Sequence, residues 1–104
     1  MRIALGQINP TVGDFPGNVN LMLRSAQEAA RKGAEVVLFP ELSLCGYPPR
    51  DLVEKASFLE RNEQELLRLA ESTADLDLAI VCGYVGRSQV STGKRALNLS
   101  LIHI

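Results

Sequence analysis

The predicted strand at residues 35–39, whose last four residues are an unbroken apolar run, constrains the fold more than any other feature of the sequence. Its side chains from position 36 read VVLF, with no polar residue between them, and Pro40 ends the run. Such a run is typical of a parallel strand that is covered on both faces. Residues 3–8 and 77–85 are similar apolar runs, and we expect them to form two further strands.

Helical patterns separate these predicted strands. After the turn-forming residues 9–17, apolar side chains recur at helical spacing, and we expect Asn18 to cap this helix and Gly33 to close it. Ser57 and Glu60 form a capping-box pattern that predicts the start of a second helix, which ends near Thr73.

The order of these elements predicts an α/β fold. Strands that alternate with helices are expected to lie parallel in one sheet, joined by right-handed crossovers. A fourth strand is expected from Ala96 onward, and the short polar connection at residues 86–94 favours an antiparallel neighbour. The predicted order is therefore β-α-β-α-β-β, with the first three strands parallel.

Composition excludes several classes of function. The 104 residues are 46% hydrophobic and 22% charged with a net charge of −1, which indicates one soluble globular unit. No basic face for nucleic acid or for an anionic membrane is predicted. The sequence also shows no secretion signal and no run of transmembrane length, so we expect a cytoplasmic protein. Cys45 and Cys82 form no CxxC pair, which favours two reduced thiols.

Glu41 is the first polar side chain after the central strand. Ligands of open α/β sheets gather at the carboxyl ends of the strands, where a partly desolvated carboxylate would suit general-base chemistry. Position alone leaves open the alternative of a solvated loop glutamate that accepts a backbone hydrogen bond.

A resemblance to a known family favours the role of Glu41 as a general base. Residues 39–52 read FPELSLCGYPPRDL, and residues 3–14 read IALGQINPTVGD, followed by Gly17 and Asn18. Both segments resemble the carbon-nitrogen hydrolase (nitrilase) superfamily, the first at its catalytic glutamate. The extension YPPxDL at residues 47–52 narrows the resemblance to glutaminase domains of glutamine-dependent NAD synthases. It covers residues 1–98.

The resemblance implies a fold, a reaction and partners. The fold would be part of an α-β-β-α sandwich, in which Glu41 is the general base for a cysteine that attacks the glutamine amide, while a lysine stabilises the oxyanion. That cysteine and that lysine are expected beyond residue 104, so the chain alone is expected to be inactive. The ammonia would pass to a synthetase domain that uses ATP and Mg²⁺ to amidate deamido-NAD. Self-association is a further expectation, and no cofactor or metal is expected in this chain.

The other candidate residues are weaker. Cys45 lies too close to Glu41 in sequence for the family's nucleophile, and Cys82, inside an apolar strand, is expected to be a buried small side chain. Lys94 is expected to be an exposed charge. Tyr47 is a candidate substrate-binding residue, although packing the loop is the alternative. Since His103 is the only histidine, no catalytic or metal-binding set of histidines can form within the chain.

Residues 99–104 read LSLIHI, and two interpretations of them stay open. They are either a non-native tail derived from a sequencing adapter, with residues 1–98 as the native part of the domain, or a genuine apolar strand end. Two other functions also stay open: a stand-alone nitrilase-type amidase, and an α/β binding module without chemistry.

Overall fold

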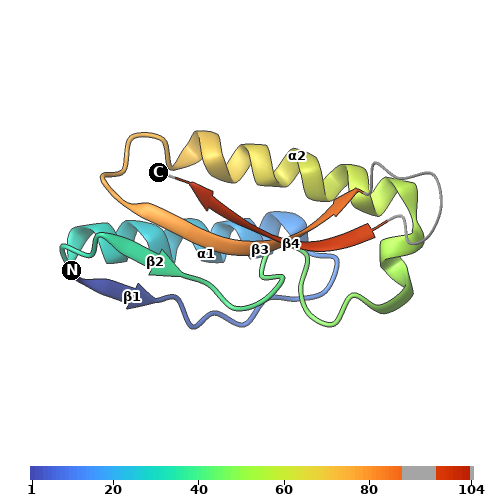
Figure 1. The fold of residues 1–104 in the computed structure, drawn as a ribbon, viewed down its shortest axis with the longest axis horizontal. Coiled ribbons are helices and arrows are strands. Elements are labelled where there is room, and N and C mark those ends of the chain that lie inside the picture. Colours follow the sequence, from blue (N-terminus) through green and yellow to red (C-terminus); the bar gives the residue numbers. More distant parts are fainter. Residues whose placement is uncertain (88–95, 104) are drawn as a thin grey trace.

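The computed structural model describes residues 1–87 and 96–103, with side chains for residues 1–86, as a sheet and two long helices (Figure 1). The sheet has the strand order β1-β2-β3-β4. In chain order the elements are β1 (Ile3–Leu5), α1 (Phe15–Arg31), β2 (Val36–Leu38), the 3₁₀ helix η1 (Arg50–Glu54), α2 (Ala56–Ser72), β3 (Ala79–Arg87) and β4 (Ala96–His103).

The pairing of the strands confirms the predicted topology. Strand β2 pairs in parallel with β1 and with β3, so that Val37 lies between Ala4 and Ile80. Strand β4 pairs antiparallel with β3. The predicted connection before β4 falls mostly on residues 88–95, which lie outside the described part of the chain.

Both long helices pack against one face of the sheet. Val37 and Ile80 are 1% exposed and pack with Ala26 of α1, while Leu69 of α2 and Cys82 of β3 share a second cluster of buried side chains. Figure 1 shows the helices running along the strands. No helix within the described residues is both long and apolar enough to cross a membrane.

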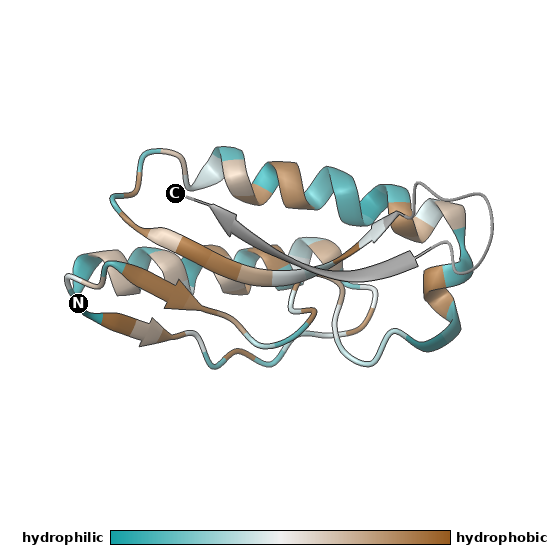
Figure 2. Cartoon of the chain, in the orientation of Figure 1, coloured by the Kyte–Doolittle hydropathy of each residue, from teal (hydrophilic) through white to brown (hydrophobic). Residues whose placement is uncertain are grey.

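The opposite face of β1 and β2 is open, which corrects the prediction of a central strand covered on both faces. Ile3 is 53% exposed, Leu5 66% and Leu38 37%, and in Figure 2 both strands are coloured as hydrophobic. Because side chains alternate along a strand, the helices can cover only every second position. The apolar run was therefore a correct signal for a strand, but only one of its faces is covered in this chain.

Helix α1 begins four residues earlier than predicted, and Asn18 does not cap it. The cap is Asp14, whose carboxylate accepts a hydrogen bond from Gly17 N at 3.1 Å. Pro16 is tolerated in the first turn because the first amide groups of a helix have no partner within the helix. The last three of the turn-forming residues, 15–17, are thus part of the helix, and the Asn18 side chain is free to make contacts other than a cap.

The remaining helix ends are partly as predicted. Gly33 closes α1 at a φ of +81°, and its N–H donates to Ala30 O at 3.0 Å. Helix α2 ends before Thr73, as predicted. The capping-box prediction is wrong, because α2 already begins at Ala56 and its cap residue, Lys55, makes no side-chain hydrogen bond to the helix.

Candidate active site

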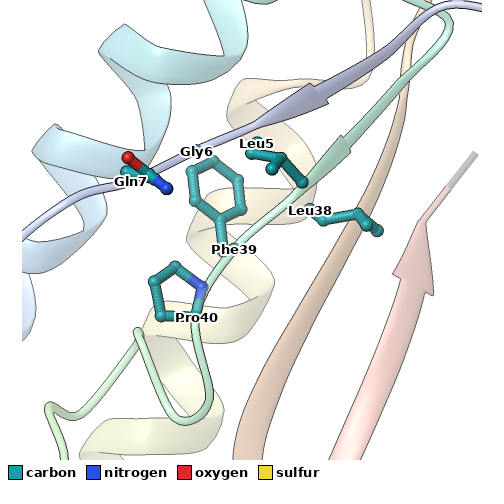
Figure 3. Close-up of a pocket in the computed structure, with 6 residues that line it drawn as sticks. All are labelled: Leu5, Gly6, Gln7, Leu38, Phe39 and Pro40. Carbon is teal, nitrogen blue, oxygen red and sulfur yellow. The ribbon is translucent and has the colours of Figure 1, made fainter.

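Glu41 follows β2 at the edge of the sheet where β1 and β2 end. Beyond β2 the sheet pairing continues through Phe39, whose N–H donates to Val81 O at 3.0 Å. A shallow apolar pocket of about 220 Å³ lies at these strand ends (Figure 3). It is lined by Leu5, Gly6, Gln7, Leu38, Phe39 and Pro40. The carboxylate therefore lies next in sequence to a pocket at the carboxyl ends of parallel strands, where ligands of α/β sheets bind.

The Glu41 side chain is exposed. The expectation of a partly desolvated carboxylate is therefore wrong for this chain. The residues that follow Glu41 explain its exposure, because Leu42 adopts a positive φ of 51° and turns its own side chain into the core, where it is 5% exposed. A non-glycine residue in this region is strained and must be held by its surroundings.

The turn after Glu41 is buried and closed by its own hydrogen bonds. Ser43, Leu44 and Cys45 are each 0% exposed. Gly46 N donates to Leu42 O at 2.8 Å, and Ser43 Oγ donates to Pro40 O at 2.6 Å. Glu41 is thus carried by a fixed backbone rather than by a mobile surface loop.

The loop after β1 packs directly on this turn. Gly13 N donates to Cys45 O at 2.9 Å. Gly46 has a φ of +87°, and a Cβ atom added there would lie 2.6 Å from Val12 Cα and Val12 N. Asn18 joins the same contact, because its Nδ2 donates to Leu44 O at 3.1 Å. The sequence did not predict these contacts, although Gly13, Asn18 and Gly46 all stand in the segments that carry the family resemblance.

Neither cysteine is placed as a nucleophile. Cys45 is 0% and Cys82 1% exposed, and burial raises the pKa of each thiol to about 11. A hydrogen bond from the backbone of Cys45 acts in the opposite direction and lowers the pKa of its thiol, but the effect of burial is larger. Both thiols are therefore protonated near neutral pH, as expected for structural cysteines.

Of the remaining candidates, only Tyr47 has a described side chain. Tyr47 follows the buried turn and is 60% exposed, so its ring does not fill the core. Lys94 lies outside the described residues, and the backbone of His103 belongs to β4. Within the described residues no group of three or more His, Cys, Asp or Glu side chains could hold a metal ion.

Comparison with known proteins places this site in a family context. Residues 2–102 match the family described as carbon-nitrogen hydrolase. The glutamine-dependent NAD(+) synthetase of Thermotoga maritima is 39% identical over 85 residues, which are 82% of this chain and 15% of that protein. The chain thus spans less than a fifth of the length of this relative.

Two solved structures share the fold. A glutamine-dependent NAD(+) synthetase from Cytophaga hutchinsonii superimposes with a TM-score of 0.87 over 99% of this chain and 17% of its own, at 24% identity. An amidase from Nesterenkonia sp. superimposes with a TM-score of 0.74 over 83% of this chain and 32% of its own, at 32% identity. The sheet and the two helices that carry Glu41 therefore recur in larger proteins.

Proposed function

The chain belongs to the carbon-nitrogen hydrolase family, and from this premise we propose that it is the first part of a glutaminase domain that supplies ammonia for NAD synthesis. One structural observation carries the proposal: a carboxylate, Glu41, is presented at the carboxyl end of β2 on a turn whose next four residues are at most 5% exposed. The 39% identity to the Thermotoga maritima synthetase supports the choice of glutamine as substrate.

In the proposed reaction Glu41 moves protons. Its carboxylate accepts the proton of a cysteine thiol from the rest of the domain, and the thiolate attacks the amide carbon of glutamine. Glu41 returns the proton to the leaving nitrogen, so that ammonia departs and a thioester remains. It then takes a proton from water, whose oxygen attacks the thioester, and the thiolate leaves with that proton. Glutamine and water are thus converted to glutamate and ammonia.

The exposure of Glu41 supports this role. A base that serves a nucleophile from another segment must be open toward that segment, and the turn points Glu41 outward while it buries the following side chains. Exclusion of water from the carboxylate would then come from the segment that covers it. Such covering strengthens the base and protects the thioester.

We further propose that residues 1–104 alone do not hydrolyse glutamine. Their only cysteines are Cys45 and Cys82, both buried and protonated, and neither can attack a substrate without local unfolding. ATP and Mg²⁺ would be bound by a synthetase domain elsewhere in the protein. The proposed location is the cytoplasm, where ATP is available, and Tyr47 is proposed to lie at the entrance for glutamine.

A stand-alone amidase is the second candidate, and one observation favours it. The Nesterenkonia amidase is 32% identical to this chain and covers 83% of this chain. This part of the sequence is therefore also compatible with an amidase that is not coupled to a synthetase. The two candidates share Glu41 and differ in what the rest of the gene encodes.

Long-read sequencing of the genomic locus across the Asn98 codon separates these candidates. The proposal predicts a reading frame that continues into a lysine, a cysteine and an ATP-binding synthetase region. The complete gene product should then form NAD from deamido-NAD with ATP, Mg²⁺ and either glutamine or free ammonia. The stand-alone amidase would be supported instead by a reading frame that ends after the hydrolase domain and by a gene product that hydrolyses simple amides.

A further inference from the structure

Asn18 has a buried side chain that the proposed chemistry does not use. It lies in the first turn of α1 and is 1% exposed, although asparagine is a residue that usually lies at the surface. Burying an amide is costly unless its donors and its acceptor are paired. The pairing of this side chain therefore indicates what it holds.

The Asn18 amide is fully paired, and its partners come from two loops. Its Oδ1 accepts from Thr11 N at 2.7 Å, and its Nδ2 donates to Thr11 O at 2.8 Å. Its Nδ2 also donates to Leu44 O at 3.1 Å. Thr11 belongs to the loop after β1 and Leu44 to the turn after β2, so one side chain joins both loops.

The contact with Leu44 is transmitted to Glu41 by the backbone. Between these residues the chain makes the closed turn in which Leu42 has a positive φ of 51° and Ser43 bonds back to Pro40 O. The side chains of this turn are too tightly packed to shift independently, since those from Leu42 to Cys45 are at most 5% exposed. A displacement at Leu44 O is therefore expected to move the Glu41 backbone.

The geometry points to Asn18 as a positioning residue for Glu41. It fixes the turn after β2 against the start of α1 and thereby sets where the carboxylate meets the attacking thiol. This inference rests on the proposed glutaminase function. A displacement of about 1 Å in a catalytic group can cost roughly a hundredfold in rate, so a tether of this kind has a measurable effect.

Two substitutions in the complete enzyme test the inference. Asn18→Asp keeps the size of the side chain and the acceptor for Thr11 N but removes both donors. Asn18→Ala removes all three hydrogen bonds. For both, kcat for glutamine hydrolysis should fall by about 10- to 100-fold while KM for glutamine changes by less than about threefold. NAD formation from free ammonia should stay within about twofold of the wild type.

Asn62 offers a control, although its buried Oδ1 has no hydrogen-bond partner within the described residues. It is also a buried amide, 0% exposed, and its Nδ2 donates to Val85 O, in β3 rather than in the turn after β2. Asn62→Ala removes the same chemical group and should lower thermal stability without changing kcat for glutamine hydrolysis by more than about twofold. A merely structural role of Asn18 would give the two alanine variants the same kinetic profile.

Each result decides the inference. Asn18 variants with wild-type kcat would overturn it, and so would a rise in KM alone, which would indicate substrate binding. Failure of both Asn18 variants to fold, while Asn62→Ala folds, would make Asn18 a structural residue and would also overturn it. A wild-type enzyme that hydrolyses no glutamine would instead refute the proposed function, and the inference would fall with it.

Discussion

At the scale of single residues, one turn gives two neighbouring side chains opposite properties. Glu41 is exposed, whereas Cys45, four positions later, is 0% exposed with a pKa raised to about 11 by burial. Leu42, which has a positive φ of 51°, lies between them in the sequence. The same backbone thus makes the carboxylate available and the thiol inert.

The two buried thiols predict a loss of stability at alkaline pH. Burial raises the pKa of Cys45 and Cys82 to about 11 from an ordinary value of 9.0, so between pH 9 and about 11 the unfolded chain releases these protons while the folded chain keeps them. The contribution of the two thiols to the free energy of unfolding is therefore complete below pH 9 and is lost as the pH rises to about 11. The full effect is on the order of 2 kcal/mol for each thiol.

Chemical denaturation of the complete protein at several pH values would measure this effect. A Cys45→Ala/Cys82→Ala variant serves as the reference, because it lacks both titrating groups. The advantage of the wild type over this variant should be constant below pH 9 and shrink between pH 9 and 11. A difference that does not change with pH would show that the thiols are not desolvated.

At the residue scale the sequence predicted the environment of Cys82 correctly and that of Glu41 wrongly, while the role of Glu41 stays a prediction. It indicated Glu41 as the carboxylate of the site and Cys82 as a buried small side chain, and the structure confirms the burial of Cys82. It did not predict the exposure of Glu41. That exposure depends on a leucine at positive φ, a conformation that runs against its intrinsic preference and is imposed by the surrounding fold.

At the scale of elements, the loops after β1 and β2 act as one unit. Gly46 is essential to this contact, because its φ is +87° and a Cβ atom there would lie 2.6 Å from the Val12 backbone. Gly13 has a similar φ of +82°, but a Cβ atom added there would have no heavy atom within 4 Å apart from its neighbours in the chain. A comparison of alanine substitutions at the two glycines therefore distinguishes the cost of backbone strain from the cost of a steric clash.

Gly46→Ala should destabilise the complete protein more than Gly13→Ala does. Gly13→Ala introduces strain alone, which costs about 1–2 kcal/mol. Gly46→Ala adds a collision with backbone, so we expect a further loss of about 1–3 kcal/mol together with slower glutamine hydrolysis. Thermal unfolding and steady-state kinetics of both variants would measure this difference. Equal effects would mean that the two loops can separate without consequence for the site.

Element boundaries show where sequence patterns stop being informative. Gly33 ends α1 as predicted, because a glycine after a helical pattern supplies the positive φ that this helix end requires. The start of α1 was predicted wrongly, since Asp14 and Asn18 are both good capping residues and only the tertiary contact of Asn18 with Leu44 decides between them. Contacts between distant loops leave no periodic signal in a sequence.

At the scale of the whole molecule, the sheet has a covered and an open face. Ile3, Leu5 and Leu38 expose apolar side chains on the open face. The sandwich implied by the resemblance predicts a second layer over this face, which the apolar run in β2 would help to hold. The described residues do not contain such a layer.

Leu5→Lys should have opposite effects in the short chain and in the complete protein. Leu5 is 66% exposed here, so a charge in its place should reduce self-association of the 104-residue chain. In the complete protein the same charge would be buried without a partner and should lower stability by about 3 kcal/mol or more. Sedimentation velocity of the chain and thermal unfolding of the complete protein would show both effects. Unchanged stability of the complete protein would mean that this face stays open.

The central claim is that Glu41 is the general base of a glutaminase. Release of ammonia from glutamine by the complete protein, compared between the wild type and Glu41→Gln, tests it most directly, since the substitution keeps the shape of the side chain and removes its basicity. We predict a loss of hydrolysis of at least about 10²-fold, with NAD formation from free ammonia within about twofold of the wild type. A Glu41→Gln enzyme that hydrolyses glutamine at the wild-type rate would contradict the claim, because another group would then have to act as the base.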